Sequence, residues 1–411
     1  MNARSESSSR PAEAGRTGQA VALGLILLTV SWGLLHVGFW HRNPIIDTPV
    51  YQGFGTKILD GEVPYRDFPV EYPPAALPVF VLPALAEEEH YGSAFEILMW
   101  TCAVAMVVLV AVTLAGVRAS SLRLYGATAF VGLAPLALGS VILSRYDLWP
   151  ATLTVGALAA LVAGRDRVGF GLLGLATAAK LYPGVILPVA FLWVARRRGW
   201  RDAAIAFSAF AGVVLALFIP FAVLSRGGLW DSLTSQLGRP LQIESLGSSL
   251  LLVAHQLGVY DPTVVSTHGS QNLAGSFPDS LASILTALQV VAIVAVWILA
   301  SRRGANRERL LAASAAAVVA FIAFGKVLSP QFLIWLLPLV PLVGGSTGLA
   351  GCAIFAVTLV TTQLWFPHRY WDLVTLGPEA WLVLVRDLLL VGLFAALLVA
   401  IRQTHEAARS A

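Results

Sequence analysis

The sequence predicts an all-α protein that crosses a membrane many times. Of the 411 residues, 57% are hydrophobic and only 12% are charged, whereas a soluble domain carries roughly 25% charged residues. The mean hydropathy is +0.77. Apolar runs close to the length of about 20 residues that a membrane-spanning helix needs recur along the chain. The composition therefore excludes a soluble globular domain and indicates a polytopic membrane protein.

Twelve stretches are apolar enough to be transmembrane helices, although some are short. Two of these, 168–180 and 183–195, are required by charge, because the arginines before the first and after the second both favour the cytoplasmic side. The chain must therefore reverse between them, at Leu181-Tyr182-Pro183. The expected spans are 20–40, 93–117, 124–143, 147–163, 168–180, 183–195, 203–224, 281–300, 310–327, 331–343, 347–366 and 380–401.

The basic residues set the orientation of the bundle. Seventeen arginines and no lysine fall on the side that we assign to the cytoplasm, because cytoplasmic loops carry an excess of basic residues. The two long loops, 41–92 and 225–280, then both lie outside the cytoplasm. The run 73–86 is too short and too rich in proline to cross, so we expect it to be interfacial or re-entrant. Only short basic turns remain on the cytoplasmic side, where no nucleotide-binding domain fits.

The chain divides into three parts. Residues 1–19 are rich in Ser, Ala and Arg, which predicts a disordered cytoplasmic N-terminus. Residues 20–401 form the transmembrane domain and 402–411 a cytoplasmic tail. Cys102 and Cys352 lie in apolar runs and indicate neither a disulfide framework nor a zinc site. The pI of 9.2 reflects the distribution of arginine across the membrane, so we expect no nucleic-acid partner.

The first outer loop brings carboxylates, tyrosines and prolines together. Asp47 is the candidate general base, which would take a proton from a sugar hydroxyl and contribute about 10²–10⁴-fold to the rate; a helix N-cap is the alternative. Asp67 and Glu71 are candidate ligands for the hydroxyls of a sugar or an acceptor. Tyr51 and Tyr72 are candidates to stack on a sugar ring. The alternative for this loop is a rigid cap on the bundle, set by its prolines.

Cations lie at the outer ends of the later spans. Lys180 and Lys326 are candidate phosphate ligands, because an ionisable residue at membrane depth usually faces a cavity or a partner. The alternative is a lysine that extends to the outer headgroups. Arg239, in the second outer loop, is a further candidate phosphate ligand, or else a surface residue paired with Glu244.

A short motif at another outer span end adds two candidates. Arg145 is a candidate phosphate ligand, and Asp147, like Gln331, is a candidate ligand of the sugar or acceptor; the alternative is an interfacial pair between Arg145 and Asp147. The sequence has no metal-site spacing of His, Cys or carboxylates. It also has no Asp-x-Asp pair, phosphate-binding loop or dinucleotide-binding motif. We therefore expect no metal and no cofactor, without excluding a divalent ion.

Five motifs, taken in order, resemble those of a known family. They are Asp47-Thr-Pro-Val-Tyr51, Gly61-Glu-Val-Pro-Tyr65-Arg-Asp67, Glu71-Tyr-Pro-Pro74, Lys180-Leu-Tyr-Pro183 and Lys326-Val-Leu-Ser-Pro-Gln331. Their order and the topology resemble glycosyltransferase family 87, bacterial membrane proteins with the GT-C fold. The resemblance implies a GT-C-like bundle, a polyprenyl-phosphate sugar as donor, with mannose as the expected sugar, and an inverting transfer. It also implies a catalytic acid in the first outer loop, at the position of Asp47.

The residues support the same class of function. A site that faces away from the cytoplasm has no access to nucleotide sugars, so its donor must be carried by the membrane. A phosphate leaves as a stable anion, so a single base suffices, whereas a glycosidase needs a second, acidic carboxyl. We expect transfer to a glycolipid or glycan of the bacterial cell envelope, at the plasma membrane and in contact with its lipids. The alternative is a secondary transporter or a flippase of a lipid-linked sugar, for which broken helices are typical.

Overall fold

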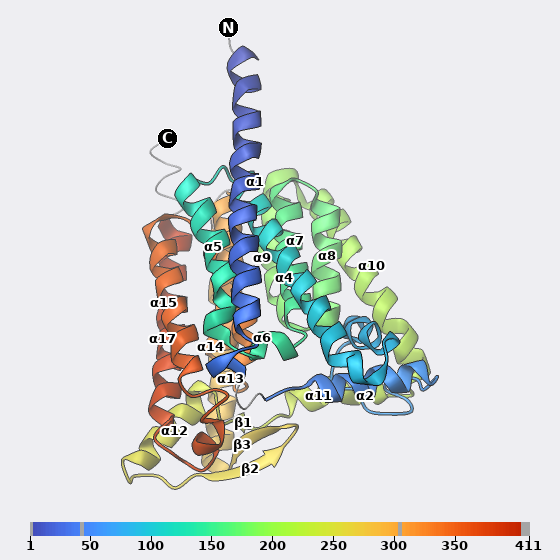
Figure 1. Ribbon diagram of the computed structural model, residues 1–411, viewed down its shortest axis with the longest axis vertical. Coiled ribbons are helices and arrows are strands. Elements are labelled where there is room, and N and C mark those ends of the chain that lie inside the picture. Colours follow the sequence, from blue (N-terminus) through green and yellow to red (C-terminus); the bar gives the residue numbers. More distant parts are fainter. Residues whose placement is uncertain (1–2, 42–44, 303–305, 404–411) are drawn as a thin grey trace.

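The computed structural model describes residues 3–41, 45–302 and 306–403, and these are almost entirely helical (Figure 1). The longer helices form one bundle. They are α1 (Ala3–Leu34), α4 (Tyr91–Gly116), α5 (Ser121–Leu138), α7 (Leu148–Val162), α8 (Asp166–Ala179), α9 (Leu187–Arg198), α10 (Trp200–Leu224), α13 (Ser276–Ser301), α14 (Arg307–Ala323), α15 (Gly345–Gln363) and α17 (Ala380–Gln403).

Seven helices of the described residues are long and apolar enough to cross a membrane, namely α1, α4, α5, α10, α13, α15 and α17. The remaining expected spans correspond to shorter elements: α7, α8, α9, α14 and the 3₁₀ turns η6 (Pro330–Leu336) and η7 (Val340–Leu342). The prediction of an all-α polytopic membrane protein is confirmed. The expected reversal between 168–180 and 183–195 is also present, where η5 (Tyr182–Ile186) joins α8 to α9.

The N-terminal segment differs from the expectation. Residues 1–19 were expected to be disordered, but α1 is helical from Ala3 and extends beyond the bundle (Figure 1). The physical reason is that alanine, arginine and glutamate favour helix, and extending an existing helix is far easier than starting one. At the other terminus α17 ends at Gln403, so most of the expected tail 402–411 lies outside the described residues.

The core and the membrane-facing surface lie on different helices. In α14 every residue from Arg309 to Ala320 is buried, because its many alanines let neighbouring helices approach closely. In α10, by contrast, only Ala203 and Ala206 are buried. Its outward side chains are large and apolar, as expected where lipid is the solvent.

The two outer loops pack together at one end of the bundle, which we call the loop end, while both chain termini lie at the opposite, terminal end (Figure 1). The first loop contributes α2 (Thr48–Leu59), η2 (Pro74–Ala76), α3 (Leu77–Val81), η3 (Pro83–Leu85) and η4 (Glu88–His90); the second contributes α11 (Gly228–Leu237) and α12 (Leu246–Gln256). Ser232 Oγ donates to the Val70 carbonyl at 2.5 Å. A Cβ at Gly228 would collide with the Tyr65 carbonyl, so this close approach of the loops requires glycine.

A small antiparallel sheet in the second loop was not expected. Its strands are β1 (Leu241–Gln242), β2 (Thr263–Thr267) and β3 (Ser270–Ala274), in the order β1-β3-β2. Thr267 pairs with Ser270, so His268 and Gly269 form a two-residue turn with φ of 52° and 65°. Two consecutive residues with positive φ are typical of the turn that closes a tight hairpin.

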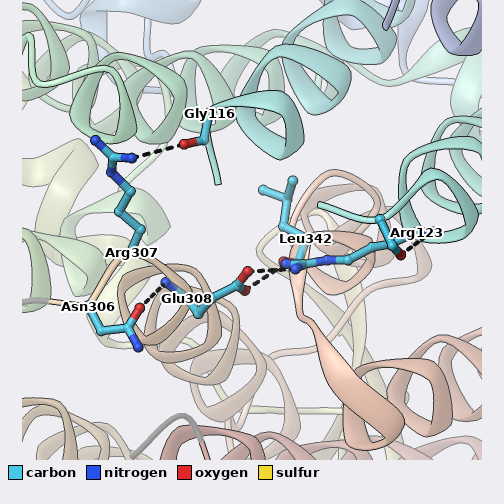
Figure 2. Close-up of polar contacts among 7 residues, drawn as sticks. Gly116, Arg123, Asn306, Arg307, Glu308 and Leu342 are labelled. Carbon is cyan, nitrogen blue, oxygen red and sulfur yellow. Dashed lines mark hydrogen bonds and ion pairs between the residues drawn. The ribbon is translucent and has the colours of Figure 1, made fainter. Parts of the chain in front are cut away.

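The terminal end is held by a set of polar contacts that we call the terminal clamp: Arg123, Glu308 and Arg307 with the carbonyls of Leu342 and Gly116 (Figure 2). The Arg123 guanidinium donates to both Glu308 carboxylate oxygens, at 2.6 and 2.7 Å, and to the Leu342 carbonyl. Arg307 donates to the Gly116 carbonyl at 3.0 Å. The clamp therefore joins α4, α5 and η7 to the first turn of α14.

Candidate active site

The centre of the loop end is the short turn between α6 (Val141–Ser144) and α7. Arg145 is extended there, with φ of −115° and ψ of 135°, so the helix is interrupted and three consecutive side chains point to different partners. Arg145 reaches Asp47, the Tyr146 ring lies 4.6 Å from Lys180 Nζ, and Asp147 accepts from Lys180. One turn thus joins the first outer loop to the α8–α9 hairpin.

Asp47 forms an ion pair with the buried Arg145. Tyr51 Oη donates to Asp47 Oδ2 at 3.3 Å, and Arg145 also donates to the Ile45 carbonyl at 3.4 Å. Asp47 occupies the N-cap position of α2, but its side chain makes no capping hydrogen bond. Its carboxylate is 26% exposed. The carboxylate is therefore partly open, and a carboxylate in such a position can act as a general base.

Asp147 is fully buried. Its Oδ1 accepts from Lys180 Nζ at 2.5 Å and from Trp335 Nε1 at 2.5 Å. The Lys180 ammonium lies 5.1 Å from the Trp335 ring and 5.6 Å from the Phe332 ring. Desolvated cation–π contacts of this kind stabilise the charge. Lys180 is therefore enclosed by aromatic rings and by its aspartate, and the interfacial pair between Arg145 and Asp147 does not form.

An aromatic cluster links these two ion pairs. Tyr51 stacks on Phe80 with ring centroids 4.5 Å apart, and the Tyr146 ring lies 5.8 Å from Tyr51 and 5.1 Å from Tyr72. Tyr51 has no exposed surface, so it supports Asp47 and cannot stack on a sugar in this structure. Tyr72 is half-buried and keeps one accessible side.

Arg239 and Lys326 complete a group of four cations. Arg239 donates to Ser270 Oγ at 2.9 Å, and Lys326 Nζ donates to the Leu237 carbonyl at 2.7 Å. Neither has a carboxylate ion-pair partner within the described part of the chain. The charges of Arg145 and Arg239 act on Lys180, and that of Arg239 acts on Lys326.

Glu244 is buried, 2% exposed, and the charges of Arg145 and Arg239 act on it. It was considered only as a surface partner of Arg239, and that alternative is wrong: no ion pair joins the two, and Gln242 Nε2 donates to the Glu244 carboxylate. Burial raises the pKa of Glu244 to about 7, although Arg386, Gln242, Arg145 and Arg239 oppose the shift.

Three other candidate ligands lie apart from the Asp47–Arg145 pair. Asp67 accepts two hydrogen bonds from Arg66, both at 2.8 Å, and these lower its pKa to about 2. Glu71 is exposed and faces the hairpin turn, where a Cβ at Gly269 would lie 3.9 Å from both of its carboxylate oxygens. Gln331 lies in η6, four residues before Trp335.

Trp335 and Glu244 are the site residues that the sequence did not single out as functional. Trp335 lies inside an expected span, where a tryptophan is typical of packing, so no sequence signal marks it. Away from this site, the exposed Glu87, Glu89 and His90 bring three possible metal-ligand atoms within 4.8 Å of one another among the described residues. Exposed acidic groups of this kind are common without a metal.

A comparison with known protein families identifies the class of this protein. The model of glycosyltransferase family 87 matches residues 70–330, which is more than half of the chain and includes Arg145, Lys180, Arg239 and Lys326. The match begins after Asp47, so it bears on the class of enzyme and not on that residue. No curated protein matches the chain. The chain therefore belongs to glycosyltransferase family 87 and is a polytopic membrane glycosyltransferase.

Proposed function

We propose that this enzyme moves a sugar, which we take to be mannose, from a polyprenyl-phosphate donor to a glycolipid or glycan acceptor of the bacterial cell envelope. The reaction takes place on the extracytoplasmic side of the plasma membrane, which is the loop end. The observation that carries the proposal is the pairing of one partly exposed carboxylate, Asp47, with Arg145. Arg145 belongs to a group of four cations, because the charges of Arg145 and Arg239 act on Lys180 and that of Arg239 acts on Lys326. The motif resemblance supports the choice of donor and sugar.

Asp47 is the general base of the proposed reaction. It takes the proton of the acceptor hydroxyl while the hydroxyl oxygen attacks the anomeric carbon. The bond from that carbon to the phosphate oxygen breaks on the opposite face, and its electron pair leaves with the phosphate, so the configuration is inverted. The leaving phosphate needs no proton, so no second acid is required. Proton removal by a positioned base contributes about 10²–10⁴-fold.

The four cations divide into two pairs with different tasks. Arg239 and Lys326 lack a carboxylate partner in the described residues and are suited to the donor phosphate, whose negative charge grows as it leaves. Arg145 and Lys180 are each paired with an aspartate. They hold Asp47 and Asp147 in place and add a weaker positive field.

Two groups of the first outer loop, one exposed and one half-buried, are best placed for the acceptor. Glu71 is exposed and Tyr72 half-buried, and both lie in the first outer loop near Arg239, whose charge acts on Tyr72. A hydroxyl-rich acceptor would bind there through the carboxylate of Glu71 and the ring of Tyr72. Asp67 is a weaker candidate because Arg66 and the Val63 amide already occupy its oxygens.

The terminal clamp supports an enzyme over a transporter or flippase. A carrier must open its site to both sides of the membrane in turn. Here Arg123 ties the start of α5 to Glu308 of α14 and to the end of η7, opposite the loop end. A closed terminal end is consistent with a site that is served from one side and from the lipid.

The test uses the full-length protein in proteoliposomes with labelled polyprenyl-phosphate mannose and a glycolipid acceptor. We expect a mannosylated acceptor whose anomeric configuration, determined by NMR, is opposite to that of the donor. GDP-linked mannose supplied in place of the lipid donor should give no product. Product formed only from the nucleotide sugar would overturn the proposed donor. Movement of label across the bilayer without any transfer would favour the flippase.

A further inference from the structure

A buried pair of opposite charges lies within the outer half of α17. Arg386 and Asp387 are both completely buried, and Arg386 Nε lies 2.7 Å from Asp387 Oδ1. The Arg386 guanidinium also lies 5.5 Å from the Trp365 ring. Charged residues inside a membrane span are costly and usually serve a function. Neither residue belongs to the catalytic proposal.

The other contact of Arg386 points to that function. Its NH2 group donates to the main-chain carbonyl of Glu244 at 2.6 Å. Glu244 ends the loop segment that carries Arg239, and the start of this segment is held by Lys326. Lys326 Nζ donates to the Leu237 carbonyl at 2.7 Å, and its own carbonyl accepts from the Gln242 amide at 3.0 Å.

We propose that Arg386 is a positioning residue for the phosphate site. Arg386 holds the main chain of the 237–245 segment at the Glu244 carbonyl. Lys326 holds the same segment at the Leu237 carbonyl and the Gln242 amide. Together they keep Arg239 in one position. The role assigned to Arg239 rests on the proposed function; the fixing of the segment does not.

Arginine is suited to this task for a chemical reason. Its planar guanidinium offers five N–H donors in a rigid fork, so it can serve a carboxylate and a main-chain carbonyl at the same time. A lysine at this position has a point charge and no fork. Loops are otherwise mobile, and a mobile Arg239 would lose entropy each time it bound a phosphate.

The first experiment needs no variant. In hydrogen–deuterium exchange on the full-length protein in nanodiscs, the amides of 241–245 should exchange at least tenfold more slowly than those of Tyr260 and Asp261 in the turn after α12, which donate no backbone hydrogen bond within the described residues. Exchange as fast as in that turn would overturn the proposal, because the segment would then not be fixed. This measurement does not depend on any transferase activity.

The second experiment compares Arg386→Lys with Arg402→Lys, a control at the exposed end of the same helix. We expect Arg386→Lys to exchange faster over 238–245 and to raise the KM for polyprenyl-phosphate mannose about tenfold, as for a lost hydrogen bond to a charged group, with a smaller change in kcat. The control should match the wild type. A folded Arg386→Lys with wild-type exchange over 238–245 would refute the proposal. If that variant does not fold, Arg386→Gln, which keeps an N–H donor and removes the charge, is measured in the same way, and wild-type exchange over 238–245 in it would refute the proposal. Faster exchange in an enzyme that transfers no mannose would keep the positioning role and remove the proposed function.

Discussion

The two ends of the bundle use the same residue types in different ways. At the terminal end, Arg123 binds both oxygens of Glu308, and Asp166 pairs with two arginines at 2.9 Å each. At the loop end, Arg239 and Lys326 have no carboxylate partner in the described residues. These contacts at the terminal end pair arginines with carboxylates, which is typical of a structural contact, whereas Arg239 and Lys326 at the loop end keep positive charge available for an anion.

The carboxylates show the same contrast. Asp166, which receives two arginines, is 9% exposed, while Asp47, which receives one, is 26% exposed. An acid enclosed by two cations cannot easily take a proton from a substrate. An acid with one cationic partner and an open side can take a proton from a substrate. The comparison predicts that the carboxylate at the loop end takes part in catalysis and that the paired charges at the terminal end stabilise the fold.

The largest expected effect is on Asp47. Asp47→Asn removes the proposed base while keeping the size of the side chain, so we expect transfer in proteoliposomes to fall about 10²–10⁴-fold. Asp60→Asn, an exposed carboxylate at the end of α2, is the matched control and should keep wild-type turnover. Wild-type turnover in Asp47→Asn would remove this residue from the mechanism.

The next effect concerns pH and Glu244. Burial raises the pKa of Glu244 from 4.5 to about 7, so the folded protein favours the protonated carboxyl. That contribution to stability is complete below about pH 4.5 and is lost as the pH rises to about 7. The difference corresponds to roughly 3 kcal/mol, since one pKa unit is about 1.4 kcal/mol.

The measurement is the unfolding midpoint in detergent between pH 5 and 8. The wild type should become less stable with rising pH, and Glu244→Gln, which cannot ionise, should show a flatter profile. The groups that face this carboxyl are Arg386, Gln242, Arg145, Arg239 and Tyr370. Parallel profiles for the two proteins would show that Glu244 does not titrate in this range.

A smaller effect is expected for Arg239. Arg239→Gln removes a cation that has no carboxylate partner, so we expect the KM for the lipid donor to rise about 10–100-fold, as for a lost contact to a charged group. Arg226→Gln changes an exposed arginine of the same loop and should leave the KM unchanged. Equal KM values for all three proteins would assign the phosphate to other cations.

The smallest effect is at the terminal clamp. Arg123→Gln and Glu308→Gln should each lower the free energy of unfolding by about 1–2 kcal/mol, because the pair is bidentate but partly exposed. The KM for the donor should stay at the wild-type value. A double-mutant cycle on thermal unfolding measures their coupling. A clamp variant that lost transfer while still folded would break the contrast between the two ends.

Much of the architecture could be predicted from hydropathy and arginine. Apolar length located the seven helices of the described residues that are long enough to cross a membrane, and the arginines on both sides of 168–195 required a reversal that η5 provides. Two features escaped prediction. The helix of residues 3–19 depends on continuing α1, and the hairpin of β2 and β3 is too short to show a strand pattern against an apolar background.

The pairing within the site could not be predicted. Arg145 and Asp147 are two residues apart, so a local pair was the natural alternative. The turn after α6 directs these side chains toward different partners. Arg145 therefore pairs with Asp47, and Asp147 pairs with Lys180. Trp335, which donates to Asp147 across a separation of 188 residues, had no signal in the sequence at all.

The sequence by itself determined that this chain is a multi-pass membrane protein and that acids and cations gather in its two long loops; it also predicts the side of the membrane on which each loop lies. These follow from transfer free energies, which depend only on composition and length. Tertiary structure alone decided which acid meets which cation, which carboxylate stays open, and that Glu244 is buried, because such choices depend on the packing of segments far apart in the chain.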